Sequence, residues 1–339
     1  MKQSFQLALL IAIGGLMLGS CKKKNETAPI EETPVTTTGG TTGNNQTGSL
    51  QSLFSNLSTP MQTFTVDAAS SRNFTCTNGT QIYIAPNAFV TQAGLPVSGV
   101  VTVQVKDVLS KKHMVLNNAF PVSNGQLLVS GGEVYFNPTQ GGQHLKIKPN
   151  GYVSYMVPAG SSPSYQMRAF YAPAATSASV SLNWAAVSSV STSSALAVMQ
   201  DTSGTGGGTY YYYLFNSDSV NWANCDYFYN NPGTKTTCTV NLSGSANNSN
   251  TMVFLSMDGA NVIARLNSTS FNTINQQFSS YANSIPVGSA YTIGAISFDG
   301  TSYYYVSQQV TMTNNMVINL PALTQTSKAQ IEANLSSLP

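Results

Sequence analysis

Hydrophobic and polar positions alternate along several short stretches between residues 61 and 158. In the stretch 97–108, valines and polar side chains take opposite faces, with Val101, Val103 and Val105 alternating with Thr102, Gln104 and Lys106. Ile82 and Ile84 share a face in the same way, and 131–138 and 151–158 read as further strands. Asn-Gly and Gly-Gly pairs between these stretches are typical of hairpin turns. The pattern predicts an antiparallel β-sandwich over residues 49–184.

A second region of alternating strands covers residues 209–323, after a Ser-, Thr-, Ala- and Gly-rich link at 185–208. Asp258-Gly259 and Asp299-Gly300 each lie between alternating stretches, so we interpret them as hairpin turns rather than as metal or catalytic loops. Residues 324–339 contain a predicted short helix, capped by Thr326 or Ser327. The predicted fold is therefore all-β, with two antiparallel β-sandwich domains and a short C-terminal helix.

The chain begins with a basic residue and an almost wholly apolar run from Phe5 to Leu18. This run is shorter than the roughly 20 residues that cross a hydrocarbon core, so residues 1–20 are predicted to be a signal peptide. The residues Leu18-Gly19-Ser20-Cys21 resemble the bacterial lipobox. That resemblance implies cleavage before Cys21 and a diacylglycerol on its thiol; the alternative is an ordinary signal peptide with an incidental cysteine.

Residues 21–48 are predicted to be a disordered tether, because they are rich in Thr, Gly, Pro and Asn and offer almost nothing to bury. Three lysines, Lys22 to Lys24, directly follow the candidate lipid attachment site. At an anionic membrane surface each of them contributes up to about 1 kcal/mol of attraction. The expected partner of this end of the chain is therefore a membrane, reached through the N-terminal lipid.

Composition narrows the classes of function. Only 8% of the residues are charged and the formal net charge is +2, with nine acidic and ten basic residues from Leu50 onward. The sequence has no basic stripe, so we expect no binding to nucleic acid. The sequence has no His-x-x-x-His or Cys-x-x-Cys spacing and no phosphate-binding loop or Gly-x-Ser-x-Gly motif. We therefore expect no catalytic residues, no metal site and no cofactor.

One long stretch resembles a known domain. The segment "NGTQIYIAPNAFVTQAGLPVSGVVTVQVKDV" (78–108) is similar to the β-sandwich domain of ankyrins and netrin receptors, in a form found in lipoproteins of Bacteroidota. The matching positions are Gly79, Thr80, Ile82, Ile84, Pro86, Ala88, Phe89 and Val90. Glu133 stands where those relatives usually carry Met.

A second stretch extends the resemblance to the later half of the chain, through Trp222, Asn224, Cys225, Asp226 and Phe228. It implies a Bacteroidota outer-membrane lipoprotein family of undefined role, facing either the periplasm or the cell surface. The function expected from it is a non-catalytic binding, adhesion or structural role in the cell envelope. The alternatives are a glycan-binding lipoprotein of a nutrient-uptake system and an envelope hydrolase, and the partner would be an envelope protein or a glycan.

Aromatic side chains supply the candidate binding residues. The chain has 17 Tyr and 2 Trp. Four tyrosines from two clusters are the predicted ligand-facing aromatics: Tyr211, Tyr213, Tyr303 and Tyr305. The alternative is that alternating tyrosines of one strand lie half in the core and half in solvent. We interpret Trp222 and Asp226 as a buried pair in which the carboxylate accepts backbone N–H bonds, with a ligand corner as the alternative.

Three cysteines remain once Cys21 is lipidated. If residues 225–238 form a hairpin with its tip at 230–233, Cys225 and Cys238 face each other and form a disulfide, leaving Cys76 unpaired. Three free buried thiols are the alternative. Asp218-Ser219-Val220 resembles the three-residue O-glycosylation pattern of Bacteroidota, which makes Ser219 a candidate modification site.

Overall fold

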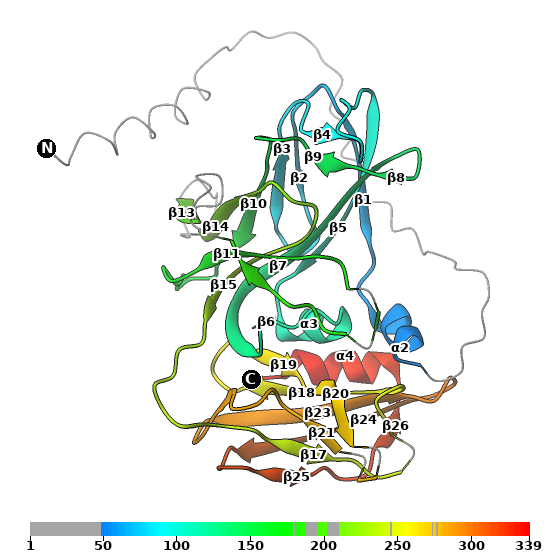
Figure 1. Ribbon diagram of the computed structural model, residues 1–339, viewed down its shortest axis with the longest axis vertical. Coiled ribbons are helices and arrows are strands. Elements are labelled where there is room, and N and C mark those ends of the chain that lie inside the picture. Colours follow the sequence, from blue (N-terminus) through cyan, green and yellow to red (C-terminus); the bar gives the residue numbers. More distant parts are fainter. Residues whose placement is uncertain are drawn as a thin grey trace, which may run out of the picture. The chain divides into compact units, whose positions relative to one another are not determined.

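The computed structural model describes residues 49–175, 177–178, 180–187, 196–201, 210–244, 246–272, 274–275 and 277–339. The predicted signal peptide and the whole predicted tether, including the lipid site Cys21, lie outside these residues. The described chain is mostly β-strand, arranged in several sheets with three short helices (Figure 1). The predicted all-β class with a short C-terminal helix is confirmed.

The first group of sheets contains one large and one smaller antiparallel sheet. In the large sheet the order is β1 (Gln62–Asp67), β5 (Val100–Val108), β7 (Gln126–Gln140), β15 (Asn221–Phe228), β11 (Arg168–Ala172) and β12 (Ala185–Ala186), with β6 (Val122–Ser123) and β8 (Gln143–His144) on β7. In the smaller sheet the order is β13 (Ala197–Asp201), β14 (Tyr210–Ser217), β10 (Val153–Pro158), β3 (Gln81–Ile84) and β2 (Arg72–Thr75). A two-stranded pair joins β4 (Phe89–Val90) to β9 (Lys146–Ile147).

The alternation seen in the sequence explains how these two sheets pack. Val101, Val103 and Val105 of β5 are fully buried, and Ile82 and Ile84 of β3 are nearly so. All five belong to the core between the sheets. The expected face assignments are therefore confirmed for these strands.

The second group of sheets follows residue 234. Five strands form one sheet in the order β19 (Ile263–Arg265), β18 (Thr251–Met257), β23 (Ala290–Phe298), β24 (Tyr303–Thr311) and β26 (Thr324–Thr326). Four form another in the order β20 (Asn267–Asn272), β21 (Gln277–Ser279), β17 (Thr239–Asn241) and β25 (Val317–Asn319), and β16 (Lys235–Thr236) pairs with β22 (Ile285–Pro286). Asp258-Gly259 and Asp299-Gly300 occupy the β18–β19 and β23–β24 hairpin turns, as predicted. The pairing of β17 with β25 is parallel, unlike the rest.

The sheets divide at a different place from the predicted domain boundary. β14 pairs with β10, and β15 pairs with both β7 and β11, so residues 210–228 complete the first group of sheets rather than opening the second. The segment 197–201, expected within the link, is an edge strand of the first group. Long-range strand pairing decides to which group of sheets each strand belongs, whereas the predicted domain boundary rested on the composition of the link.

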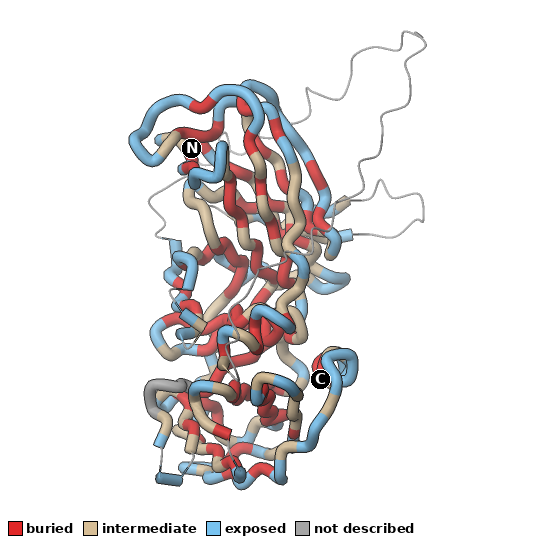
Figure 2. Tube along the Cα trace, turned by 90° about the vertical axis from the view of Figure 1, so that its right-hand side faces the viewer, coloured by how far each residue is buried: buried red, intermediate tan, exposed pale blue. Residues whose placement is uncertain are grey.

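A shared core joins the two groups of sheets. It contains Trp184 and Trp222 from the first group and Phe254 and Ile296 from the second. Three helices pack into it: α2 (Leu50–Leu57), α3 (Lys111–Leu116) and α4 (Lys328–Ser336). Each helix is capped by a serine whose hydroxyl accepts a backbone N–H, and the cap of α4 is Ser327. Figure 2 shows buried residues continuing along the strands of both groups.

Candidate functional site

The structure brings two acids together that lie far apart in the sequence. Glu133 of β7 is opposite Asn224 of β15, and Asp226, two residues further along β15, is opposite Ser130. A bulge between Asn224 and Asp226 shifts the register by one residue. Gly131 accommodates this bulge, because a Cβ there would lie 2.8 Å from the Cys225 carbonyl oxygen.

Burial dominates the electrostatics of this acid pair. Glu133 and Asp226 both have 0% exposure, and neither carboxyl oxygen of Glu133 has a hydrogen-bond partner among the described residues. Burial, and secondarily the charge of Asp226, raises the pKa of Glu133 well above its ordinary value. Asn224 Nδ2 donates to Asp226 Oδ2 at 2.6 Å, but burial still raises the pKa of Asp226. General acid–base catalysis requires hydrogen-bond reach to a substrate, and neither buried acid offers it.

Trp222 and Asp226 are both buried, as predicted, but they lie four residues apart along the extended strand β15 rather than side by side. Trp222 is 8% exposed and packs edge-on against Trp184, with ring centroids 6.3 Å apart. The Gly131 amide and the Ser130 hydroxyl both favour the ionised form of Asp226. This region is a polar contact inside the core rather than a ligand corner.

The two histidines lie apart from the acid pair and from each other. His144 Nδ1 contacts Asn137 Oδ1 at 2.8 Å near the surface. Burial lowers the pKa of His113, and its Nδ1 has no partner among the described residues. Within those residues, no three His, Cys, Asp or Glu side chains come together in a way that could hold a metal ion.

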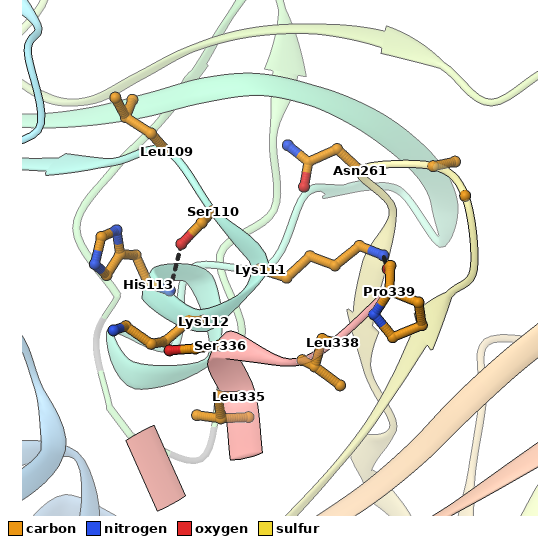
Figure 3. Close-up of a pocket in the computed structure, with 12 residues that line it drawn as sticks. Leu109, Ser110, Lys111, Lys112, His113, Asn261, Leu335, Ser336, Leu338 and Pro339 are labelled. Atoms are coloured by element: carbon orange, nitrogen blue, oxygen red, sulfur yellow. Dashed lines mark hydrogen bonds between the residues drawn. The ribbon is translucent and has the colours of Figure 1, made fainter. Parts of the chain in front are cut away.

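A cavity of about 520 Å³ lies between α3, the end of α4 and the β18–β19 turn (Figure 3). The side chain of Lys111 extends across it, and its Nζ donates to the Met257 carbonyl at 2.6 Å and also to the Pro339 carbonyl. Burial lowers the pKa of Lys111 to about 8, and the charge of Asp258 opposes this shift. Lys112 adds a second amine to the lining, beside His113, whose lowered pKa favours the neutral imidazole. The cavity is therefore suited to polar or anionic groups.

A second cavity, of about 350 Å³, adjoins the first, and Leu338 and Pro339 line both. Its walls come from β23, β24 and the end of α4, and they carry hydroxyl and amide groups rather than charges: Thr292, Tyr305, Ser307, Gln308, Gln309, Asn334 and Ser337. Of these residues, only Tyr305 is among the predicted ligand-facing aromatics. No local sequence pattern marks Gln309 and Asn334 as cavity-lining residues, because the cavity exists only where α4 packs beside β24.

The structure corrects part of the tyrosine prediction. Tyr213 is only 3% exposed, and its hydroxyl accepts the Ser164 N–H, so it is a core residue and faces no ligand. Tyr211 and Tyr303 are half-buried, and Tyr303 packs against the Phe298 ring. On β14 the outward positions are Tyr212, which pairs with Met199, and Tyr210, which is 51% exposed.

The predicted disulfide is wrong. Cys225 lies opposite Ala169 in the first group of sheets, whereas Cys238 is in the core of the second. β15 pairs with β7 and β11 instead of turning back on residues 234–241, so the two cysteines never face each other. Cys76, Cys225 and Cys238 are all free and buried.

Ser219 lies in the bend between β14 and β15 and is half-buried. Its hydroxyl donates to Asp218 Oδ1 at 3.1 Å. Its O-glycosylation remains a prediction.

Comparisons with known proteins do not identify a family. A scan against protein-family models and a search of curated proteins found no match to this chain. Among the described residues, no helix has the length and hydrophobicity needed to cross a membrane.

Proposed function

We propose that this chain is a lipid-anchored protein of the bacterial outer membrane with a non-catalytic binding, adhesion or structural role. The anchor is the Cys21 thiol, and the support for it is the apolar run ending at Leu18, the lipobox-like residues and the lysines that follow. The resemblance to Bacteroidota lipoproteins points the same way. Periplasmic and surface orientations both fit this proposal.

The observation that carries the non-catalytic role is the burial of Glu133 and Asp226. A glycosidase needs two carboxyl groups, about 5–9 Å apart, that face a substrate cleft. The acids that the fold brings together have no exposed surface, while the two cavities present lysines, amides and hydroxyls. This distribution favours binding over hydrolysis.

A glycan-binding role in a nutrient-uptake system is the second candidate. The uncharged cavity beside Tyr305 favours it, because amides and hydroxyls match the donors and acceptors of a sugar.

The anchor is tested by replacing Cys21 with Ser in cells that are fed a labelled fatty acid. The wild-type chain should take up the label and sediment with membranes, and Cys21→Ser should do neither. Lys23→Gln is the matched control, since it changes the same segment and keeps the thiol. Labelling and sedimentation of Cys21→Ser would overturn the anchor.

A further inference from the structure

The uncharged cavity between β24 and α4 has the features of a built site. Nine residues line it, and none has a charged side chain. Its volume of about 350 Å³ is within the range of pockets that hold small molecules. Tyr305 contributes an aromatic wall, and its ring also packs against the shared core, which holds it in place.

One hydroxyl in the wall has no partner. Thr292 is 7% exposed, and its Oγ1 makes no hydrogen bond to any described residue. Ser256 of β18 lies directly opposite Thr292 and is fully buried. Its Oγ also has no hydrogen-bond partner among the described residues. Leaving a buried hydroxyl unsatisfied costs about 1–3 kcal/mol. Because Thr292 Oγ1 is covered in this structure, a bound group recovers that energy when the cavity wall opens enough for a donor or acceptor to reach it.

The outer edge of β24 borders the same cavity. β26 pairs with β24 only at Tyr303 to Tyr305, and from Ser307 onward this edge has no strand neighbour in the described part of the chain. Backbone N–H and C=O groups at such an edge are available for hydrogen bonds. They add donors and acceptors to the amides of Gln308, Gln309 and Asn334.

We infer that this cavity binds a neutral saccharide, with one sugar ring against Tyr305 and its hydroxyls bonded to Thr292, Gln309 and Asn334. Sugar hydroxyls both donate and accept, as the amide and hydroxyl lining requires, and an aromatic wall suits the apolar face of a sugar ring. An acidic sugar would be drawn instead to the neighbouring cavity, which Lys111 and Lys112 line. The inference rests on the proposed binding role and names its ligand class.

The test uses the full chain purified in detergent and isothermal titration calorimetry. The probes are neutral oligosaccharides of glucose, mannose and xylose, with sialyllactose as the acidic comparison and an uncharged extended peptide as the strand-forming comparison. We expect at least one neutral oligosaccharide to bind. Thr292→Val and Gln309→Ala should each weaken that binding roughly tenfold, the loss expected for one hydrogen bond.

Tyr304→Phe is the matched control. Tyr304 neighbours Tyr305 but does not line the cavity, and its hydroxyl donates to Asp299 in the hairpin turn. This variant should bind as the wild type does, and thermal melts should show that all three variants are folded.

Three outcomes would overturn the inference: no neutral oligosaccharide binds, binding survives both Thr292→Val and Gln309→Ala, or only sialyllactose or the peptide binds. Cleavage of a bound oligosaccharide would instead refute the non-catalytic role and leave the cavity assignment standing. Failure of the Cys21 anchor would be seen by fractionation alone, so the two proposals fail separately.

Discussion

Replacing Glu133 with Gln should stabilise the protein relative to wild type, and this difference should increase as the pH rises. Gln has nearly the same shape as Glu but cannot ionise. In the folded protein Glu133 is fully buried between β5 and β15, and burial together with Asp226 keeps its pKa well above the ordinary value of 4.5. In the unfolded chain the same carboxyl is in water, and its pKa is close to that ordinary value.

The sign of the effect follows from proton linkage. Above the unfolded pKa, the folded state keeps a proton that the unfolded state has released, so raising the pH favours unfolding. The stability that Glu133 contributes is fully present below the unfolded pKa and is lost as pH rises toward the folded pKa. Each pH unit within that window changes the free energy of unfolding by about 1.4 kcal/mol.

Urea denaturation at about pH 5, 6 and 7 measures this effect as the difference between Glu133→Gln and wild type. The difference should grow in favour of the variant as the pH rises, by up to about 1.4 kcal/mol per pH unit while the pH lies between the unfolded and the folded pKa. Asp226 is present in both proteins, so most of its own titration cancels. Any cost of burying the Gln amide does not depend on pH and shifts only the intercept.

Glu332→Gln is the control, because it also removes one carboxyl group. Glu332 lies on α4 with a 39% exposed side chain, 3.9 Å from Lys328. An exposed pair of this kind contributes about 0–1 kcal/mol, so this variant should stay close to wild type at every pH. A difference between Glu133→Gln and wild type that does not change with pH would mean that Glu133 is ionised in the folded protein.

Two further predictions concern the cores. Gly294→Ala should destabilise the fold by about 1–3 kcal/mol in urea denaturation, because its Cβ would lie 2.3 Å from the Phe254 ring; a loss under about 0.5 kcal/mol would show that this ring moves aside freely. Cys76, Cys225 and Cys238 should resist iodoacetamide in the folded protein, because burial raises the pKa of each thiol, that of Cys238 to about 11. All three cysteines should react after unfolding without reductant. If mass spectrometry found only one labelled cysteine, the Cys225–Cys238 disulfide would be supported after all.

Local patterns predicted the strands well where one face is buried. The valines of β5 alternate with polar side chains, and this period of two appears in the sequence whatever the strand pairs with. The turn pairs Asp258-Gly259 and Asp299-Gly300 are local for the same reason. These features depend on residues within a few positions of each other.

The tyrosine run shows where local patterns fail. Tyr210 to Tyr213 are four identical residues, so the sequence contains no alternation that says which rings face inward. The inward face is set by the pairing of Tyr213 with Val157 of β10, more than fifty positions earlier. A shift of one residue exchanges the two faces of a strand, and here the outward face carries Tyr210 and the half-buried Tyr212 in place of Tyr211 and Tyr213.

The same limit applies to residues that meet only through long-range strand pairing. Glu133 and Asp226 meet because β15 inserts between β7 and β11, and that choice also separates Cys225 from Cys238. A local hairpin over residues 225–238 would have closed the disulfide and would not have placed Asp226 next to Glu133. The cavity beside Tyr305 has an analogous origin, since its walls come from β23, from β24 and from the end of α4, which follows them in the sequence. Local sequence patterns therefore predict which face of a strand is buried. Which residues come together in a site depends on the long-range pairing of those strands.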